Sequence, residues 1–107
     1  MNDIYRGTTH SFEFDMETDL SEVSVMWVTL AQNGIERVTK ETEDIEIEGQ
    51  TIKVNLTQED TLALKPNRPA KIQIRILLND GTAEITETIE REVHDCLKDG
   101  VIGNENP

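Results

Sequence analysis

The sequence VSVMWVTLAQNG, residues 23–34, decides the fold class. In an extended strand successive side chains point to opposite faces, and here both faces are apolar. One face carries Val23, Val25 and Trp27, and the other carries Met26, Val28 and Leu30. A strand that is apolar on both sides is usually central in its sheet or partly covered on its outer side. We therefore predict a central strand over Val23 to Gln32 with Trp27 as the core anchor, and a functional role for Trp27 is the alternative.

The end of this strand contains a hairpin signal, Asn33-Gly34. A two-residue type I′ turn needs positive φ at both positions, which Asn and Gly tolerate best. The return strand, Ile35 to Thr42, is rich in charge, so we expect an edge or well-solvated strand.

A second hairpin is predicted over Glu43 to Leu56 around Gly49-Gln50. That turn pairs Ile47 with Ile52 and Ile45 with Val54 on a common face, so the turn and the apolar pattern agree on register. Another strand is predicted ahead of Val23, where Phe12, Phe14 and Met16 alternate with polar residues.

Thr57 to Asp60 has the pattern of a capped helix start, in which the Thr57 hydroxyl accepts from the Asp60 N–H and the Asp60 carboxylate reaches back. Pro66 and Pro69 end the helix within about two turns. We expect this short helix to cross between two sheets.

The third hairpin joins Lys71 to Leu78 with Ala83 to Val93 across Asn79-Asp80-Gly81. A strand in this register sets Ile85 opposite Ile76 and Ile89 opposite Ile72. It also sets Glu87 on the apolar face, which a β-bulge would relieve. A helix, with apolar residues every four positions from Ile85, is the alternative, but the threonines favour a strand. Val93 to Lys98 is predicted to be a turn or short helix.

These elements predict an all-β fold: an immunoglobulin-like antiparallel β-sandwich of about seven strands with one short helix. The chain of 107 residues is long enough for one domain. We expect the β-sandwich domain to span residues 1–98 and a flexible C-terminal tail to span residues 99–107.

The composition argues against several classes of partner and site. The net charge of −12 argues against nucleic acid and anionic membrane surfaces as partners, because both attract clustered Lys and Arg. A single cysteine excludes an intrachain disulfide and a cysteine-based zinc cage. The chain has no apolar run of about 20 residues and no signal-peptide pattern at its start.

Candidate chemistry is sparse. His94-Asp95-Cys96 is the one cluster that suggests a Cys–His nucleophile, and we interpret it as an exposed imidazole beside a small buried thiol. His10 is interpreted as a partly exposed strand residue. The acidic run Glu41 to Glu48 could bind calcium, but it lacks EF-hand spacing and is better read as a solvated strand. We therefore expect no catalytic residues, no cofactor and no metal.

Five segments, in the same order, resemble a family of small proteins encoded among the tail and baseplate genes of phages and prophages of Gram-positive bacteria. They are IYRGTT (residues 4–9), WVTLAQNG (27–34), LTQEDTLAL (56–64), IQIRILLNDGTA (72–83) and LKDGVI (97–102). The pattern is also similar to the N-terminal β-sandwich domain of baseplate upper proteins. The acidic stretch from Ala83 to Asp95 departs from the resemblance.

The resemblance implies a non-enzymatic structural or assembly module of the virion, made in the bacterial cytoplasm and placed in the tail or baseplate. Its partners would be other virion proteins or further copies of the chain. As docking residues we predict Ile4 and Tyr5 in the N-terminal lead and Val101 and Ile102 near the C-terminus, and the alternative is that both segments fold back on the sandwich. A carbohydrate- or host-surface-binding module is the second hypothesis, which the low aromatic content of 4% weakens.

Overall fold

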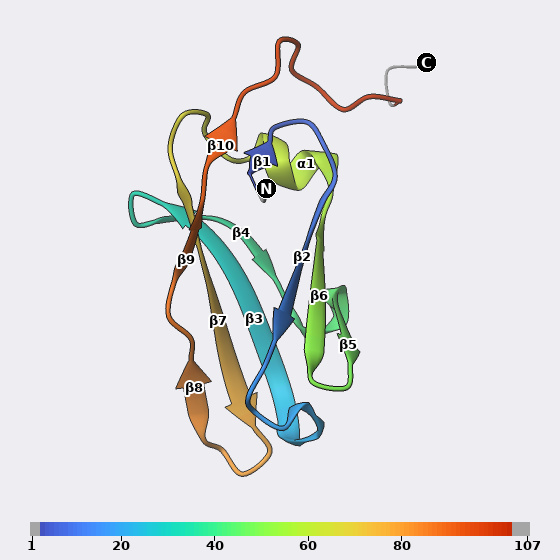
Figure 1. Ribbon diagram of the computed structural model, residues 1–107, viewed down its shortest axis with the longest axis vertical. Helices are drawn as coiled ribbons and strands as arrows, with labels where there is room; N and C mark the ends of the chain where they lie inside the picture. Colours follow the sequence, from blue (N-terminus) through green and yellow to red (C-terminus); the bar gives the residue numbers. More distant parts are fainter. Residues whose placement is uncertain (1–2, 104–107) are drawn as a thin grey trace.

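The computed structural model describes residues 3–103, and two antiparallel sheets face each other in it (Figure 1). The first sheet has the order β2 (His10–Asp15), β6 (Thr51–Leu56), β5 (Ile45–Glu48). The second has the order β4 (Ile35–Lys40), β3 (Val23–Gln32), β7 (Ala70–Leu78), β8 (Ala83–Ile85), and β9 (Ile89–Arg91) also pairs with β7. Strands β1 (Ile4–Tyr5) and β10 (Val93–His94) form a small parallel pair.

The helical segments of the described chain are short: η1 (Leu20–Glu22), η2 (Thr42–Asp44) and α1 (Gln58–Leu62). None of them has the length or the apolar character needed to cross a membrane. Helix α1 and the β1–β10 pair lie together at one end of the molecule, at the top of Figure 1.

The strand order identifies the fold as an immunoglobulin-like β-sandwich. In that fold strands B, E and D lie in one sheet and strands C, F and G lie in the other, and variable-type domains add strand C′ to the second sheet. Here β2, β6 and β5 correspond to B, E and D. Strands β4, β3, β7 and β8 correspond to C′, C, F and G. The fold-class prediction is confirmed. Strands β1 and β10 are short strands that it did not include, and β8 and β9 both lie within the strand predicted over Ala83 to Val93.

The core lies between the two sheets. Its largest contributions come from alternate residues of β3 and β7 on one side and of β2 and β6 on the other. They are Met26, Val28, Leu30, Ile72, Ile74 and Ile76 against Phe12, Ile52, Val54 and Leu56. Burying an aliphatic side chain of this size stabilises the fold by about 1.5–3 kcal/mol relative to leaving it exposed.

The prediction that Trp27 anchors the core is wrong. Its side chain is 41% exposed, on the outer face of the second sheet. The inner face of β3 is the one with Met26 and Val28, and it ends at Gln32, which is buried. The Gln32 amide donates to the Lys65 and Arg68 carbonyls and accepts from the Lys65 N–H, so its polar atoms are satisfied. Alternation alone could not choose between two apolar faces, because the choice depends on packing against the other sheet.

The first two hairpins follow their turn chemistry. Asn33 and Gly34 have φ of 53° and 78°, as a type I′ turn requires, and β4 is an edge strand. In the second hairpin Ile45 pairs with Val54, and Ile47 pairs with Ile52. Both of these residue pairs in the second hairpin are the predicted ones.

Helix α1 begins with the predicted capping box. The Thr57 hydroxyl accepts from the Asp60 N–H at 3.1 Å, and the Asp60 carboxylate accepts from the Thr57 N–H at 2.8 Å. The helix ends at Leu62, ahead of Pro66, and it connects β6 of the first sheet with β7 of the second. The predicted crossover is therefore confirmed.

The segment after the third turn is extended, as predicted, but it is interrupted. Ile89 pairs with Ile72 as expected, whereas Ile76 pairs with Glu84 instead of Ile85. The register slips by one residue at Thr86, whose hydroxyl accepts from the Ile74 N–H and whose N–H donates to the Ile74 carbonyl. This slip has the effect expected of a bulge: Glu87 is exposed, and so is Ile85.

The predicted turn or helix over Val93 to Lys98 is wrong at its start. Val93 and His94 form β10, which runs parallel to β1. This pairing joins residues 4–5 with residues 93–94, and the sequence of residues 93–98 alone does not predict it.

Candidate functional site

The outer face of the second sheet carries two rows of side chains that cross three strands. Cross-strand pairing sets Val25 beside Leu77 and Leu77 beside Ala83 in the first row. The second row is Trp27, Arg75 and Ile85. We call these six residues the Trp27 face. Since β3 and β7 are the central strands of the sheet, the face has a firmly hydrogen-bonded base.

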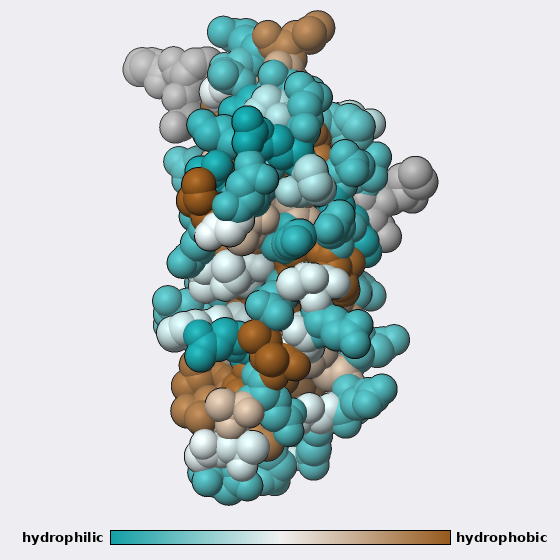
Figure 2. Space-filling view, turned by 90° about the vertical axis from the view of Figure 1, so that its left-hand side faces the viewer, coloured by the Kyte–Doolittle hydropathy of each residue, from teal (hydrophilic) through white to brown (hydrophobic). Residues whose placement is uncertain are grey.

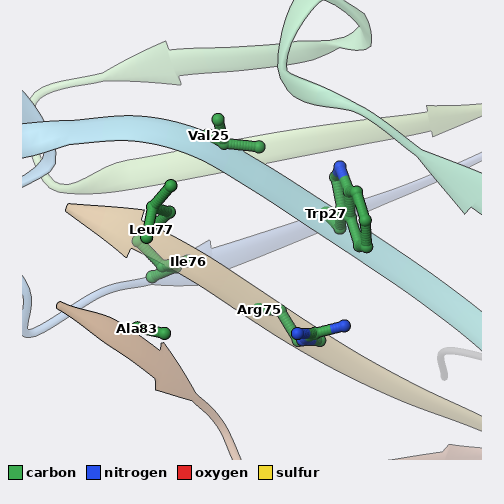
Figure 3. Close-up of a pocket in the computed structure, with 6 residues that line it drawn as sticks. All are labelled: Val25, Trp27, Arg75, Ile76, Leu77 and Ala83. Atoms are coloured by element: carbon green, nitrogen blue, oxygen red, sulfur yellow. The ribbon is translucent and has the colours of Figure 1, made fainter. Parts of the chain in front are cut away.

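The Trp27 face encloses a shallow groove of about 300 Å³, lined by all of its residues except Ile85 and by the edge of Ile76 (Figure 3). Trp27, Val25 and Leu77 are each about two-fifths exposed, and Ile85 is 59% exposed. Figure 2 views the molecule from the side of β8 and β9 and shows apolar side chains gathered in its lower half, toward the β7–β8 turn. The face is thus a contiguous apolar patch on the outer side of the sheet.

Arg75 is held over the indole of Trp27, with its guanidinium carbon 5.3 Å from the ring centroid. Within residues 3–103 it makes no ion pair. Such a cation–π contact contributes about 0.5–1 kcal/mol at an exposed site. It fixes the ring and leaves the N–H groups of the guanidinium available to a ligand.

Next to Trp27 the same sheet face becomes polar. A neighbouring hollow is lined by Trp27 and Arg75 together with Thr29, Glu36, Thr39, Glu41 and Gln73. The Thr29 and Thr39 hydroxyls share a hydrogen bond of 3.0 Å, and Thr39 also donates to the Glu36 carboxylate. The face therefore offers an aromatic and aliphatic area beside hydroxyl, amide and carboxylate groups.

The predicted docking residues have different environments. Ile4 is fully buried in the core, so its side chain cannot meet a partner, in agreement with the alternative that the lead folds back. Tyr5 is exposed and stacks on His94, with ring centroids 4.6 Å apart. Val101 is half-buried, and Ile102 is exposed while its backbone N–H and carbonyl bond to the Gln58 side chain. Residues 104–107 of the predicted tail lie outside the described residues.

The N-terminal lead is fixed by Arg6, which no pattern in the sequence identified. Its guanidinium donates to the Leu64 carbonyl at 2.8 Å and to the Leu62 carbonyl at 3.1 Å. It also pairs with the Asp95 and Asp99 carboxylates. The hydrogen bond from Arg6, helped by the Cys96 N–H, holds the pKa of Asp95 below its usual value.

The Cys96 thiol belongs to this Arg6 cluster and does not meet a histidine base. Burial, followed by the hydrogen bond to Asp99, raises the pKa of Cys96, so the thiol stays protonated at neutral pH. Asp95, Cys96 and Asp99 bring their ligand atoms within 4.8 Å of one another, but Arg6 already occupies the two carboxylates. The cluster is therefore an anchor between the chain ends.

The two histidines lie apart from the Trp27 face. His94 Nε2 is 3.0 Å from the Asp3 carboxylate. His10 is half-buried against Phe12, and burial, with a smaller contribution from Arg91, lowers its pKa. In the acidic run, Glu46 accepts from Asn55 and lies opposite Lys53.

The comparisons with known proteins add little. No protein-family model matches the chain, and no curated protein matches it significantly. Among solved structures it resembles the V domain of amphioxus IgVJ-C2, at 11% identity and a TM-score of 0.38, over 86% of this chain and 98% of that domain. The assignment of the fold rests on the strand order.

The sequence analysis placed the candidate site at the chain ends and kept a functional role for Trp27 only as the alternative to a core role. The signal was present, since residues 23–30 are apolar on both sides of the strand. Such a pattern leaves one apolar row outside the core whenever no other element covers it.

Proposed function

We propose that this protein is a non-enzymatic structural or assembly module of a phage or prophage tail or baseplate, and that it acts through protein–protein contacts. The five segments that resemble the tail- and baseplate-associated family support this role. The chain would be made in the bacterial cytoplasm and incorporated into the virion beside other tail proteins or further copies of itself.

The observation that carries the protein-binding part of this proposal is the exposed Trp27 face. Protein interfaces are enriched in aromatic residues and Arg at their centres, and those are the residue types of the Trp27–Arg75 pair. An apolar patch of this kind would be covered in an assembly, and the acidic remainder of the surface would oppose non-specific aggregation.

Immunogold labelling of purified tail particles from the encoding phage or induced prophage tests the role in the virion. We expect particles to be labelled at a fixed position along the tail. Particles that carry none of the protein, although cells contain it, would refute a structural role. The variant Trp27→Thr should fold but should be depleted from the particles.

A second candidate, carbohydrate binding, is favoured by the exposure of Trp27 itself. Sugar sites combine a stacking ring with nearby hydrogen-bonding groups, and Thr29, Thr39 and Gln73 line the hollow beside the indole. A glycan array compares the wild-type protein with Trp27→Thr. Binding that disappears in the variant would support this function, and no binding by the wild-type protein would count against it.

A further inference from the structure

We infer that the Trp27 face binds a protein surface that presents an apolar protrusion edged by lysines and arginines. This inference rests on the proposed role in protein binding and adds the chemistry of the partner. The argument has three steps: the concentration of apolar side chains, the charge around them, and the consequence for self-association.

The apolar side chains are concentrated on one rigid surface. Val25, Trp27, Leu77 and Ile85 are neighbours across β3, β7 and β8. The other large apolar side chains that are exposed in the described chain stand on separate elements or loops: Tyr5, Ile35, Ile47, Leu97 and Ile102. A partner can therefore bury several apolar groups at once only on the Trp27 face, with little change in the backbone of the paired strands.

The Trp27 face is acidic on its β4 side. Glu36 and Glu41 line the hollow on the β4 side. On the β8 side, Ile85 also borders a hollow at the sheet edge whose lining includes Asp15, Glu17, Glu84 and Glu87. Glu84 pairs with the inward-facing Ile76 and accepts from the Thr18 hydroxyl, so it lies on the opposite side of β8 from Ile85. Arg75 is the one cationic side chain that lines these hollows or the central groove.

This charge pattern selects the occupant. A second copy would bring its own Glu36 and Glu41 to a face that is already acidic, and each chain carries a net charge of −12. Like charges facing each other across an interface cost several kcal/mol, whereas opposite charges accelerate association and set the register. The complementary partner has an apolar centre that fits over Trp27 and Leu77 and a rim of Lys and Arg that meets the carboxylates.

Selection from a displayed library of random peptides, followed by titration of the synthesised winners, tests the inference. We expect the enriched peptides to combine large apolar residues with flanking Lys or Arg. The variants Trp27→Thr and Leu77→Thr should weaken their binding about tenfold or more. Ile35→Thr is the matched control, because Ile35 is similarly exposed at 52% but lies at the β3–β4 turn, and it should bind as the wild type does.

Two further measurements test the charge. Glu36→Lys and Glu41→Lys, at the two carboxylates of the hollow beside Trp27, should each weaken binding several-fold. Added salt should weaken binding by the wild-type protein, since surface charges are screened beyond about 10 Å at 0.1 M. Circular dichroism and urea unfolding confirm that each variant is folded.

Three results would overturn the inference. The first is a set of peptides that bind Trp27→Thr as tightly as the wild type. The second is a wild-type dimer in sedimentation equilibrium that Trp27→Thr dissolves, which would make a second copy the occupant. The third is glycan binding that depends on Trp27. Absence of the protein from tail particles would instead refute the proposed virion role and leave the chemistry of the face intact.

Discussion

Arg6 shows how one side chain can hold three segments together. It bridges the N-terminal lead, the end of α1 and the loop of Asp95 and Asp99. A planar guanidinium can donate in several directions at once, and lysine cannot reproduce that geometry.

Arg6→Ala should lower the free energy of unfolding by about 1–3 kcal/mol, because the Leu62 and Leu64 carbonyls lose their charged donor. Arg6→Lys should recover only part of the loss. Urea unfolding measures both, with the exposed Arg68→Ala as a control that should change little. An unaltered unfolding midpoint in Arg6→Ala would show that the anchor is unimportant.

Trp27 is exposed, so replacing it should cost the fold little. Trp27→Thr should lower the free energy of unfolding by at most about 1 kcal/mol, whereas Leu30→Ala on the inner face of the same strand should lower it by about 2–5 kcal/mol. Since the chain has one tryptophan, its fluorescence should also be that of a solvated indole, quenched efficiently by acrylamide. A blue-shifted emission that resists quenching would contradict the outward orientation of the ring.

At the scale of the element, the break between β8 and β9 is stabilised by Thr86. Its hydroxyl replaces the ladder acceptor for the Ile74 N–H at 3.1 Å. Thr86→Val keeps the shape but leaves that N–H without a partner, so we expect a loss of about 1–3 kcal/mol in the free energy of unfolding. The exposed Thr88→Val is the control. Equal stability of the two variants would mean that the hydroxyl contributes nothing.

The capping box of α1 gives a pH-dependent stability. Partial burial would raise the pKa of Asp60, but the Lys40 ammonium at 2.6 Å and the bonds from Thr57 outweigh it and lower the pKa below its ordinary value of 3.8. A lowered folded-state pKa contributes stability that is present above 3.8 and is lost as the pH falls through the folded value.

Asp60→Asn keeps an oxygen for the Thr57 N–H but removes the charge. It should be less stable than the wild type by about 1 kcal/mol at neutral pH, and the difference should shrink in acid below pH 3.8. Urea unfolding over a pH series measures this. The exposed Asp44→Asn should show no comparable trend, and a difference for Asp60→Asn that persists unchanged in acid would contradict the assignment.

At the scale of the whole molecule, the two chain ends contribute unequally. Ile4 is in the core, and β1 pairs with β10, whereas the contacts of Ile102 are exposed hydrogen bonds to Gln58. Loss of assembly after removal of the N-terminal lead would therefore report a damaged fold as much as a lost docking segment.

Ile4→Ala should lower the free energy of unfolding by about 2–5 kcal/mol. A chain that stops after Asp99 keeps the partner of Arg6 and should lose no more than about 1 kcal/mol. Thermal unfolding of both proteins checks the contrast. A truncated chain that melts as early as Ile4→Ala would place the domain boundary beyond residue 98.

The sequence by itself determined the local structure: the Asn33-Gly34 turn, the register of Ile45 and Ile47, and the cap of α1. Each depends on residues close in the chain, whose φ angles, hydroxyls and alternation act over a few positions. The fold class could be predicted from these elements, because short strands joined by tight turns can bury their apolar faces in few arrangements other than two packed sheets.

Only the tertiary structure decided which face of β3 is buried, where the last strand slips, and that β1 joins β10. Both faces of residues 23–30 are apolar. Trp27 points outward because the opposite row, with Met26 and Val28, packs in the core with Phe12 and Ile52. Contacts between distant segments are chosen by the packing of the whole core, and a one-residue change in register reverses every side chain. The candidate site lies on the apolar face that this packing left outside.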